Sequence, residues 1–515
     1  MNGNRSPARR GVGRIPGVPP FVALMGLFAL SMYIPAIVAA SARDWQTARS
    51  FLQPGTLFLA VFAMVAFATA GSPRWRGARG DLMTLLAAFS ALPLMLALPL
   101  WESLQDRRYL DVYFEMVSSV TTTGATVFDD PARLSGADHL WRALVGWLGG
   151  LLMWTAAAAL LEPLGLGGFE ILRQPGHVDR SGGDRTGRRK DGPARLRRHV
   201  ILLFPAYATL TLVLWAGLMV AGGDPLSAAC HAMSTMATSG ISPIGGIDAS
   251  GAGLPGEMMV FVFFGFALSR RTFSRDHVWL DRRRLTDDPE IRMGLFFAVT
   301  VPLLLVARHF VGVIEEDAVN SLGDGLKALW GMVFMVMSFL STTGFESAAW
   351  ESALDWSGLE VPGLTLLGLA MIGGGVATTA GGVKLLRVYV LYCHANRELE
   401  RLVHPSSVGG SGGRARYLRR QGAYMAWIFF MLFAISIAVV MLALSLAGLD
   451  FETALILTIA ALSNTGPLAS IAGETPLSYA VLPDAAKLIL AGSMVLGRLE
   501  TLAIIALLNP ELWRR

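Results

Sequence analysis

The chain has 515 residues, of which 53% are hydrophobic and only 16% are charged, and its mean hydropathy is +0.51. The charges gather in short clusters between apolar runs of about 20 residues, the length that crosses a hydrocarbon core. This pattern excludes an ordinary soluble protein and predicts an all-α polytopic membrane protein. The formal charge of +5 is no indication of nucleic-acid binding, because the basic residues lie in loops, where positive charge sets orientation.

The sequence carries no pattern of a resident cofactor or metal. The two cysteines, Cys230 and Cys393, cannot form a disulfide framework or a metal site. The eight histidines lack paired-ligand spacing, and no phosphate-binding loop is present, so we expect neither a metalloenzyme nor a built-in ATPase. We expect no cleavable signal peptide, because the apolar run after the polar, basic segment 1–19 is long enough to span.

The predicted elements begin with two spans, at 21–40 and 52–70, in an N-terminal unit at 20–71. One pattern then repeats four times: a span, a shorter apolar segment and another span. The repeats are predicted at 81–161, 199–270, 291–393 and 424–508. Their segments are 82–101, 112–123 and 140–161; 199–221, 226–239 and 254–268; 291–313, 326–343 and 362–393; and 424–447, 451–465 and 485–508. The prediction is therefore ten spans and four shorter segments around a central pore.

Each shorter segment ends in a phrase that is rich in Ser and Thr and closes on glycine. A segment of this length is too short to span comfortably, and its polar end must be buried in protein or line a water-filled cavity. A helix C-terminus there supplies partial negative charge, and the following turn can present carbonyls in place of a hydration shell. One such phrase is ordinary helix packing, but four copies favour a cation filter. Its predicted residues are Thr122, Thr123, Gly124, Thr238, Ser239, Gly240, Thr342, Thr343, Gly344, Asn464, Thr465 and Gly466.

A gate is predicted on the inner side of this filter. The segment 362–393 carries five glycines within 373–382, and each costs a helix interior about 1 kcal/mol relative to alanine. We interpret this stretch as a mobile loop under the filter rather than a packing kink. Arg498 lies inside the last span, where a charge costs at least about 2.5–3.5 kcal/mol, and it would form an electrostatic barrier paired with the loop. The predicted gating residues are Gly373, Gly374, Gly375, Thr378, Thr379, Gly381, Gly382, Lys384 and Arg498.

The orientation follows from the basic clusters. With ten spans, six clusters fall on one face, and the filter phrases and more acidic loops fall on the other. By the positive-inside rule both termini are cytoplasmic and the filter opens outward. Two cytoplasmic loops, at 174–198 and 405–416, are expected to be flexible. The basic clusters lie at 5–14, 74–79, 173–198, 270–284, 397–420 and 514–515.

The four phrases, the glycine-broken segment and the run 497–500 resemble the TrkH/KtrB superfamily of potassium transporters. The stretches 111–125, 288–290 and 463–467 are close to the family pattern, and the N-terminal pair of spans favours the TrkH branch. The resemblance implies a pseudo-four-fold pore with one glycine per loop, a gating loop at 373–384 and an arginine constriction at Arg498.

The resemblance also implies a potassium-selective, channel-like uptake transporter of the bacterial inner membrane, with K⁺ as the transported ion. It implies a homodimer bound to a cytosolic TrkA/RCK-type subunit, and any nucleotide would sit on that partner. The chain departs from the family pattern at Ile241, at Leu468 and in the loop 174–198.

Two alternatives remain open. The first is a sodium-permeable or sodium-coupled cation transporter of the same fold. The second is an intramembrane serine hydrolase that uses Ser239 with His231, since a Ser–His pair is the minimum for nucleophilic catalysis. The recurrence of the phrase where no histidine accompanies it counts against the hydrolase.

Overall fold

The structure is a computed structural model that describes residues 18–69, 78–162, 168, 192–247, 250–269, 288–313, 322–357, 362–404 and 422–500. Within these residues it contains helices, turns and loops but no strand. Eight of the described helices are long and apolar enough to cross a membrane. The predicted all-α polytopic class is thereby confirmed. The basic clusters at 5–14, 270–284 and 514–515, and most of the loops 174–198 and 405–416, lie outside the described residues.

The N-terminal unit consists of two spans that pack against each other. The first span is made by α1 (Pro20–Ser31) and α2 (Tyr33–Ser41), with only Met32 between them, and the second is α3 (Trp45–Thr69). Both α1 and α2 contact α3. Pro35 lies in the first turn of α2, where the missing N–H of proline removes no intrahelical hydrogen bond.

The first two repeats each have a short helix between longer ones. In the first repeat, α4 and α5 together make one span, and α7 continues into the π-helical turn η2. The elements of the first repeat are α4 (Ala78–Ser90), α5 (Leu92–Leu104), α6 (Tyr109–Val120), α7 (Gly136–Ala156) and η2 (Ala157–Leu161). Those of the second are α10 (Gly192–Val220), α11 (Pro225–Ala237) and α12 (Gly253–Leu268).

In the third repeat the last predicted span is two helices, α17 and α18, separated by residues 373–384. The elements of this repeat are α14 (Pro289–Val313), α15 (Leu322–Leu340), α16 (Trp350–Ser357), α17 (Gly363–Ile372) and α18 (Leu385–Val403). Those of the fourth are α20 (Ala423–Leu446), α21 (Phe451–Leu462), α22 (Leu468–Ile471) and α23 (Asp484–Leu499). The end of the predicted span 485–508 lies outside the described residues.

The four helices that precede the glycine phrases differ in length. Three are short, with 12 residues in α6, 13 in α11 and 12 in α21, whereas α15 has 19. α15 is close in length to the predicted segment 326–343 but begins four residues earlier, and its residues 323–340 are long and apolar enough to span. The carboxylates of Asp224 and Asp450 accept backbone N–H groups at the N-termini of α11 and α21 and thereby set where these helices begin.

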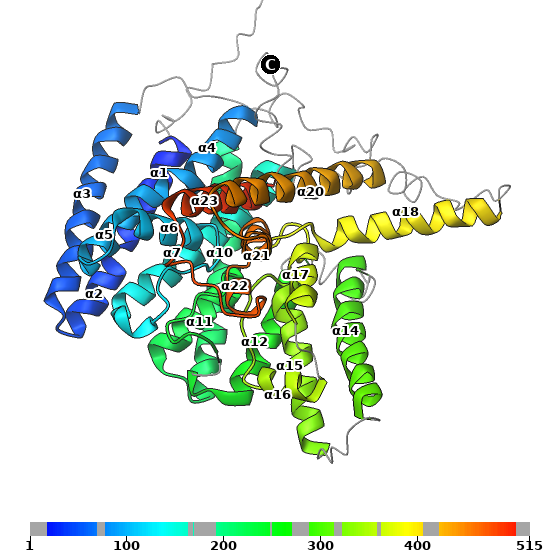
Figure 1. The fold of residues 1–515 in the computed structure, drawn as a ribbon. Helices are drawn as coiled ribbons and strands as arrows, with labels where there is room; N and C mark the ends of the chain where they lie inside the picture. Colours follow the sequence, from blue (N-terminus) through cyan, green and yellow to red (C-terminus); the bar gives the residue numbers. More distant parts are fainter. Residues whose placement is uncertain are drawn as a thin grey trace, which may run out of the picture.

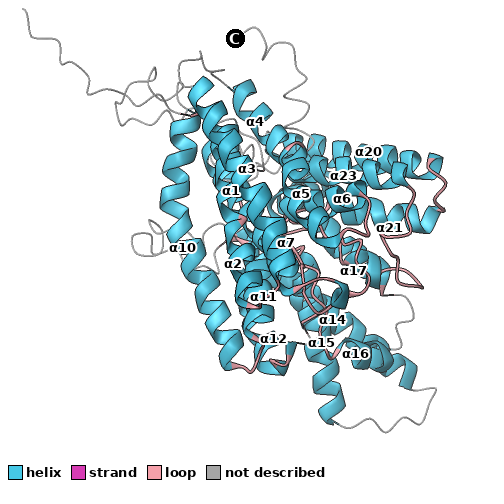
Figure 2. Ribbon diagram, turned by 90° about the vertical axis from the view of Figure 1, so that its left-hand side faces the viewer, coloured by secondary structure: helices cyan, strands magenta, loops and turns pink. Residues whose placement is uncertain are grey.

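The repeats follow one another around a common centre, as the progression of colours in Figure 1 shows. α7 packs against α11, α12 against α15, and α17 against α21, and α23 returns to contact α6 of the first repeat. Helices at the outside keep their apolar surface exposed: only 17% of the apolar window of α10 is buried within the chain, against 89% for the α7 window. Figure 2 shows α10 at one edge of the molecule and α7 among the other helices. The exposed apolar helices are suited to contact lipid.

Candidate ion filter and gate

The four helices that precede the glycine phrases, α6, α11, α15 and α21, are the candidate pore helices. All four end in the same turn. In each, the residue two places before the phrase glycine has a left-handed backbone, and the next N–H bonds to the carbonyl five residues back. This pairing defines the Schellman motif, which satisfies the last carbonyls of a helix. The left-handed residues are Thr122, Thr238, Thr342 and Asn464, with φ of 55°, 53°, 59° and 53°. The bonds are Thr123 N to Ser118 O at 2.8 Å, Ser239 N to Ser234 O at 2.9 Å, Thr343 N to Ser338 O at 3.0 Å and Thr465 N to Ala460 O at 2.8 Å.

This turn is unusual because glycine is absent from its left-handed position. A residue with a Cβ costs roughly 1–2 kcal/mol there, and for a β-branched residue such as threonine the conformation is an outlier. Strain of this kind persists where the surrounding structure enforces it and clusters at functional sites. Because the same strained turn recurs after all four helices, the four phrases are structurally equivalent.

The glycines themselves lie where each loop meets the next. A methyl group added at Gly124 would collide with the carbonyl oxygen of Ser239, and one at Gly240 would collide with that of Thr343. One at Gly344 would press on Pro467 at 3.1 Å, and one at Gly466 would collide with Gly124 and Ala125. Each loop therefore abuts the following loop, and the fourth abuts the first. The structure brings all twelve predicted filter residues together in one closed ring.

The contact between the fourth and first loops is also hydrogen-bonded. Gly466 N donates to Thr123 O at 2.6 Å, and Asn464 Nδ2 donates to Thr123 Oγ1 at 3.0 Å. Gly124, Gly240 and Gly344 have φ of +76°, +66° and +79°, but Gly466 does not share this conformation. Three of the four loop glycines therefore have a left-handed backbone, the conformation that favours glycine. At Gly466, the close approach of the first loop is what leaves no room for a side chain.

Hydroxyl groups in the loops bond to one another. Thr121 Oγ1 and Thr123 Oγ1 are 2.8 Å apart, and Ser341 Oγ and Thr343 Oγ1 are 2.9 Å apart. The fourth loop has the same pair, with Ser463 Oγ donating to Thr465 Oγ1 at 3.2 Å. The second loop has Ala237 at the first of these positions, and there Ser239 Oγ bonds instead to Ser234 Oγ at 3.0 Å. These bonds cross-brace each loop from within.

Residues 373–384 form a buried, non-helical connection that contacts the pore helices. Its Gly381 N donates to Oγ1 of Thr342 in the third loop at 2.8 Å, and its Thr379 Oγ1 donates to Met236 O at the end of α11 at 3.3 Å. Glu290 Oε1 on α14 accepts Val376 N at 2.7 Å. Lys384 Nζ donates to Ala380 O within the connection. The backbone groups freed by the helix break thus find partners inside the protein, as membrane depth requires.

Arg498 lies near the end of α23 and reaches this connection. Its side chain is 3% exposed, and Nη1 donates to Thr379 O at 2.6 Å. Nε and Nη2 of Arg498 find no hydrogen-bond partner among the described residues. A buried guanidinium with open donors is costly unless water reaches it, so this position fits a water-filled passage.

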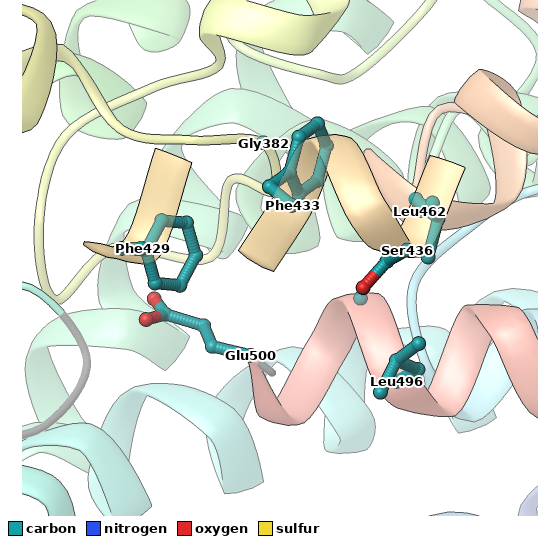
Figure 3. Close-up of a pocket in the computed structure, with 8 residues that line it drawn as sticks. Gly382, Phe429, Phe433, Ser436, Leu462, Leu496 and Glu500 are labelled. Atoms are coloured by element: carbon teal, nitrogen blue, oxygen red, sulfur yellow. The ribbon is translucent and has the colours of Figure 1, made fainter. Parts of the chain in front are cut away.

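A buried ion pair that sequence reasoning missed lies beside the same connection. Arg387 on α18 donates through Nη2 to Glu500 Oε2 at 2.7 Å and through Nη1 to Val383 O at 3.0 Å. The Arg387 guanidinium also stacks 3.5 Å from the ring centre of Phe429. Figure 3 shows Glu500 and Phe429 at one side of a small pocket that Gly382 also lines. The only signal in the sequence was the presence of two charges in apolar surroundings, 113 residues apart.

The Ser–His pair of the hydrolase alternative is absent. His231 Nε2 lies 2.9 Å from Ser242 Oγ, whereas the Ser239 hydroxyl bonds to Ser234. Ser239 therefore has no imidazole partner to activate it as a nucleophile. The site is built from turns and carbonyls rather than from a catalytic constellation.

The chain matches known transporters over nearly its whole length. Residues 48–513 match the family model TrkH, described as a cation transport protein. The Trk system potassium uptake protein TrkH of Escherichia coli (strain K12) is 30% identical, over 98% of this chain and 99% of that protein. The TrkH protein of Halomonas elongata is 31% identical, over 84% of each.

A solved structure is also similar. The crystal structure of the potassium transporter TrkH from Vibrio parahaemolyticus aligns with a TM-score of 0.78 and 26% identity, covering 96% of this chain and 98% of that one. The predicted resemblance to the TrkH branch is confirmed, and transport rather than catalysis is the function of these relatives. The chain belongs to the TrkH family of cation transport proteins.

Proposed function

We propose that the chain is a potassium uptake transporter in which K⁺ passes through the ring of four loops. The observation that carries this proposal is the closed order of the ring, in which each loop glycine abuts the next loop. A ring of equivalent turns from one chain is what a pseudo-four-fold filter requires. The names of the relatives, which are potassium uptake proteins, support the choice of ion.

In this proposal the backbone of the loops supplies the ion ligands. Hydroxyls in three of the loops bond to each other in pairs, and we assign the backbone carbonyl oxygens of the loops as the groups that replace the hydration shell. The C-termini of the four pore helices add partial negative charge at the ring. Inward flux follows the membrane potential, which supplies about 2.3 kcal/mol per charge per 100 mV without any nucleotide on this chain.

The connection 373–384 and Arg498 serve as the gate in this proposal. Arg498 holds Thr379 O by a charge-assisted hydrogen bond, a class of bond worth about 1.5–3 kcal/mol. Opening requires that this bond and the bond from Gly381 N to Thr342 Oγ1 be released together. The predicted gating residues Gly373, Gly374, Gly375, Thr378, Gly382 and Lys384 belong to the same buried connection.

We propose a homodimer in the bacterial inner membrane, with both termini cytoplasmic and a cytosolic TrkA/RCK-type subunit that carries any nucleotide. The relatives are named as members of a Trk system, which supports a multi-component assembly. α18 extends away from the other helices in Figure 1, and its end exposes Leu399, Leu402 and Val403 at 60%, 80% and 70%. An exposed apolar end of this kind suits contact with lipid or a second subunit. The proposed repeats span residues 81–161, 199–270, 291–393 and 424–508.

Rescue of a bacterium that lacks potassium uptake tests the proposal. Cells that express the chain should grow at limiting K⁺ and take up Rb⁺, and Na⁺ should compete weakly. Gly344→Ser should weaken growth at limiting K⁺ and raise Na⁺ uptake, because it adds a side chain at a φ of +79° against Pro467. Absence of rescue together with Na⁺ flux would favour the sodium-permeable alternative and reject the potassium assignment.

A further inference from the structure

Beyond the ring, each filter loop is tethered by a buried polar side chain that bonds to the segment after its glycine. The four side chains are between 0% and 3% exposed. Two are glutamates, one is a histidine and one is a lysine, and they lie on four different helices. The tethers are Glu115 Oε2 to Val127 N at 2.9 Å, His231 Nε2 to Ser242 Oγ at 2.9 Å, Glu257 Oε1 to Ala348 N at 2.8 Å and Lys487 Nζ to Ala480 O at 2.9 Å. The four loops therefore have the same backbone turn, but a different side chain holds the segment after each of them.

The third tether comes from outside its own repeat. Glu115 and His231 each occupy the position nine residues before the loop glycine on their own pore helix, but Met335 occupies that position in α15. Glu257 takes over this task from α12 of the second repeat. Its Oε2 accepts hydrogen bonds from Ser347 Oγ at 2.8 Å and from Trp330 Nε1 at 2.9 Å. The third loop is therefore positioned by its neighbour.

Charge compensation separates Glu257 from the other acidic residues at the ring. Arg142 Nε lies 2.6 Å from Glu115 Oε1, and Lys487 Nζ lies 2.7 Å from Oδ1 of Asp111 at the start of α6. The three partners of Glu257 are neutral donors, and no described Lys, Arg or His lies within ion-pair distance of it. Because all three contacts are accepted, the carboxylate is used only as an acceptor. Within the part of the chain that the structure describes, its hydrogen-bond partners are these three neutral donors.

Glu257 holds the third loop at its far end. Nearer the ring, Gly344 N donates to Ser338 O at 3.2 Å and Ser338 Oγ donates to Phe345 O at 2.7 Å. Glu257 then holds Ser347 and Ala348, three and four residues after the loop glycine. A change at Glu257 therefore acts on the segment that leads directly out of the loop.

We infer that Glu257 is a positioning residue for ion discrimination: from the adjacent repeat it fixes the segment that follows the third filter loop, with a carboxylate that has no cationic partner among the described residues. The inference rests on the proposed function, because it requires that the ring be the filter. Glu257 acts through Ser347 and Ala348 and does not itself bind the ion. Substitution of Glu257 removes its charge and an acceptor together, whereas substitution of its donors weakens the hold on the loop and keeps the carboxylate.

Glu257→Gln tests the charge in the full-length protein, reconstituted in vesicles with Rb⁺ and Na⁺ as probes. The amide keeps the volume and one acceptor oxygen but turns a donor toward Trp330 or Ala348. Discrimination of Rb⁺ over Na⁺ should fall by about tenfold, the factor that corresponds to the loss of one hydrogen bond to a charged group. The amount of protein in the membrane should not change. Glu102→Gln, at a glutamate on α5 that bonds to no described filter segment, is the control and should leave discrimination unchanged.

Trp330→Phe and Ser347→Ala weaken the tether from the other side while they keep the carboxylate. Each should lower discrimination in the same direction by a smaller factor, and they decide the question if Glu257→Gln does not reach the membrane. Selective wild-type flux with unchanged discrimination in these variants would overturn the inference and leave the proposed function standing. Absence of K⁺ or Rb⁺ flux in the wild type would overturn both, and so the two failures are distinguishable.

Discussion

The ring of four loops and the connection 373–384 are both non-helical and buried, but they are held in different ways. Each loop of the ring has the same Schellman turn, bonds its own hydroxyls or its own helix, and abuts the next loop, so much of the bracing repeats around the ring. The connection has backbone bonds near its ends, and along its length it also depends on single side chains from elsewhere, Glu290, Thr342 and Arg498. A self-braced ring is expected to stay fixed, whereas a segment held by a few outside contacts can be released by breaking them.

The largest expected effect is the collapse of the self-braced ring. Gly240→Val places a branched side chain at a φ of +66° against the carbonyl of Thr343 and should abolish potassium uptake. Gly492→Ala is the matched control, because a methyl group at this helical glycine meets nothing within 4 Å, and uptake should be normal. Growth of an uptake-deficient strain at limiting K⁺ measures both. Normal growth of the valine variant would show that the loops do not depend on one another.

The next effect concerns the ion pair beside the connection. Arg387→Met leaves Glu500 buried without its cation and should destabilise the protein by about 3–5 kcal/mol, the usual effect of breaking a buried pair. Arg387→Met combined with Glu500→Gln should recover part of this loss, because the uncompensated charge is removed. Thermal unfolding of the purified variants measures the difference. Equal loss in the single and double variants would argue against a charge effect.

Release of the connection should change rate without changing selectivity. Arg498→Ala removes the bond to Thr379 O, worth about 1.5–3 kcal/mol, and should raise the Rb⁺ flux by about tenfold or more. The ratio of Rb⁺ to Na⁺ flux should stay at the wild-type value, since the ring is braced independently. A changed ratio would mean that ring and connection are one unit, which would end the distinction drawn above.

The smallest effect uses the strain in the turns. Thr122→Gly should stabilise the protein by about 1 kcal/mol, because it relieves the left-handed threonine and its hydroxyl has no partner among the described residues. Thr342→Gly should gain less, since it also removes the acceptor of Gly381 N. The melting temperatures of the two purified variants test this order. A larger gain for Thr342→Gly would indicate that its bond to the connection contributes nothing.

Much of the fold was predictable because its signals are local. The apolar runs, the glycine phrases and the cluster of glycines at 373–382 lie within short windows of the sequence, and the structure has the corresponding helices, turns and helix break. The position of α15 differs from the predicted segment 326–343, because the helix begins at Leu322 and ends at Leu340, before the turn of the Ser/Thr phrase.

What the sequence could not indicate is which segments meet. The bond from Asn464 to Thr123 joins residues 341 positions apart, and the tether from Glu257 to Ala348 joins residues 91 apart. Such pairs depend on how the repeats are arranged around the centre, and no local periodicity encodes that arrangement. The same holds for Gly466, whose need for glycine arises from the first loop and not from its own backbone.

The bond between Gly466 and Thr123 has a consequence for how the protein is made. The first loop enters the membrane early in synthesis, but its partner on one side is supplied only when α21 has been translated. Until then the ring lacks the neighbour that Gly466 supplies beside Gly124. In the proposed function, no enclosed path for an ion exists before the chain has been synthesised as far as Gly466.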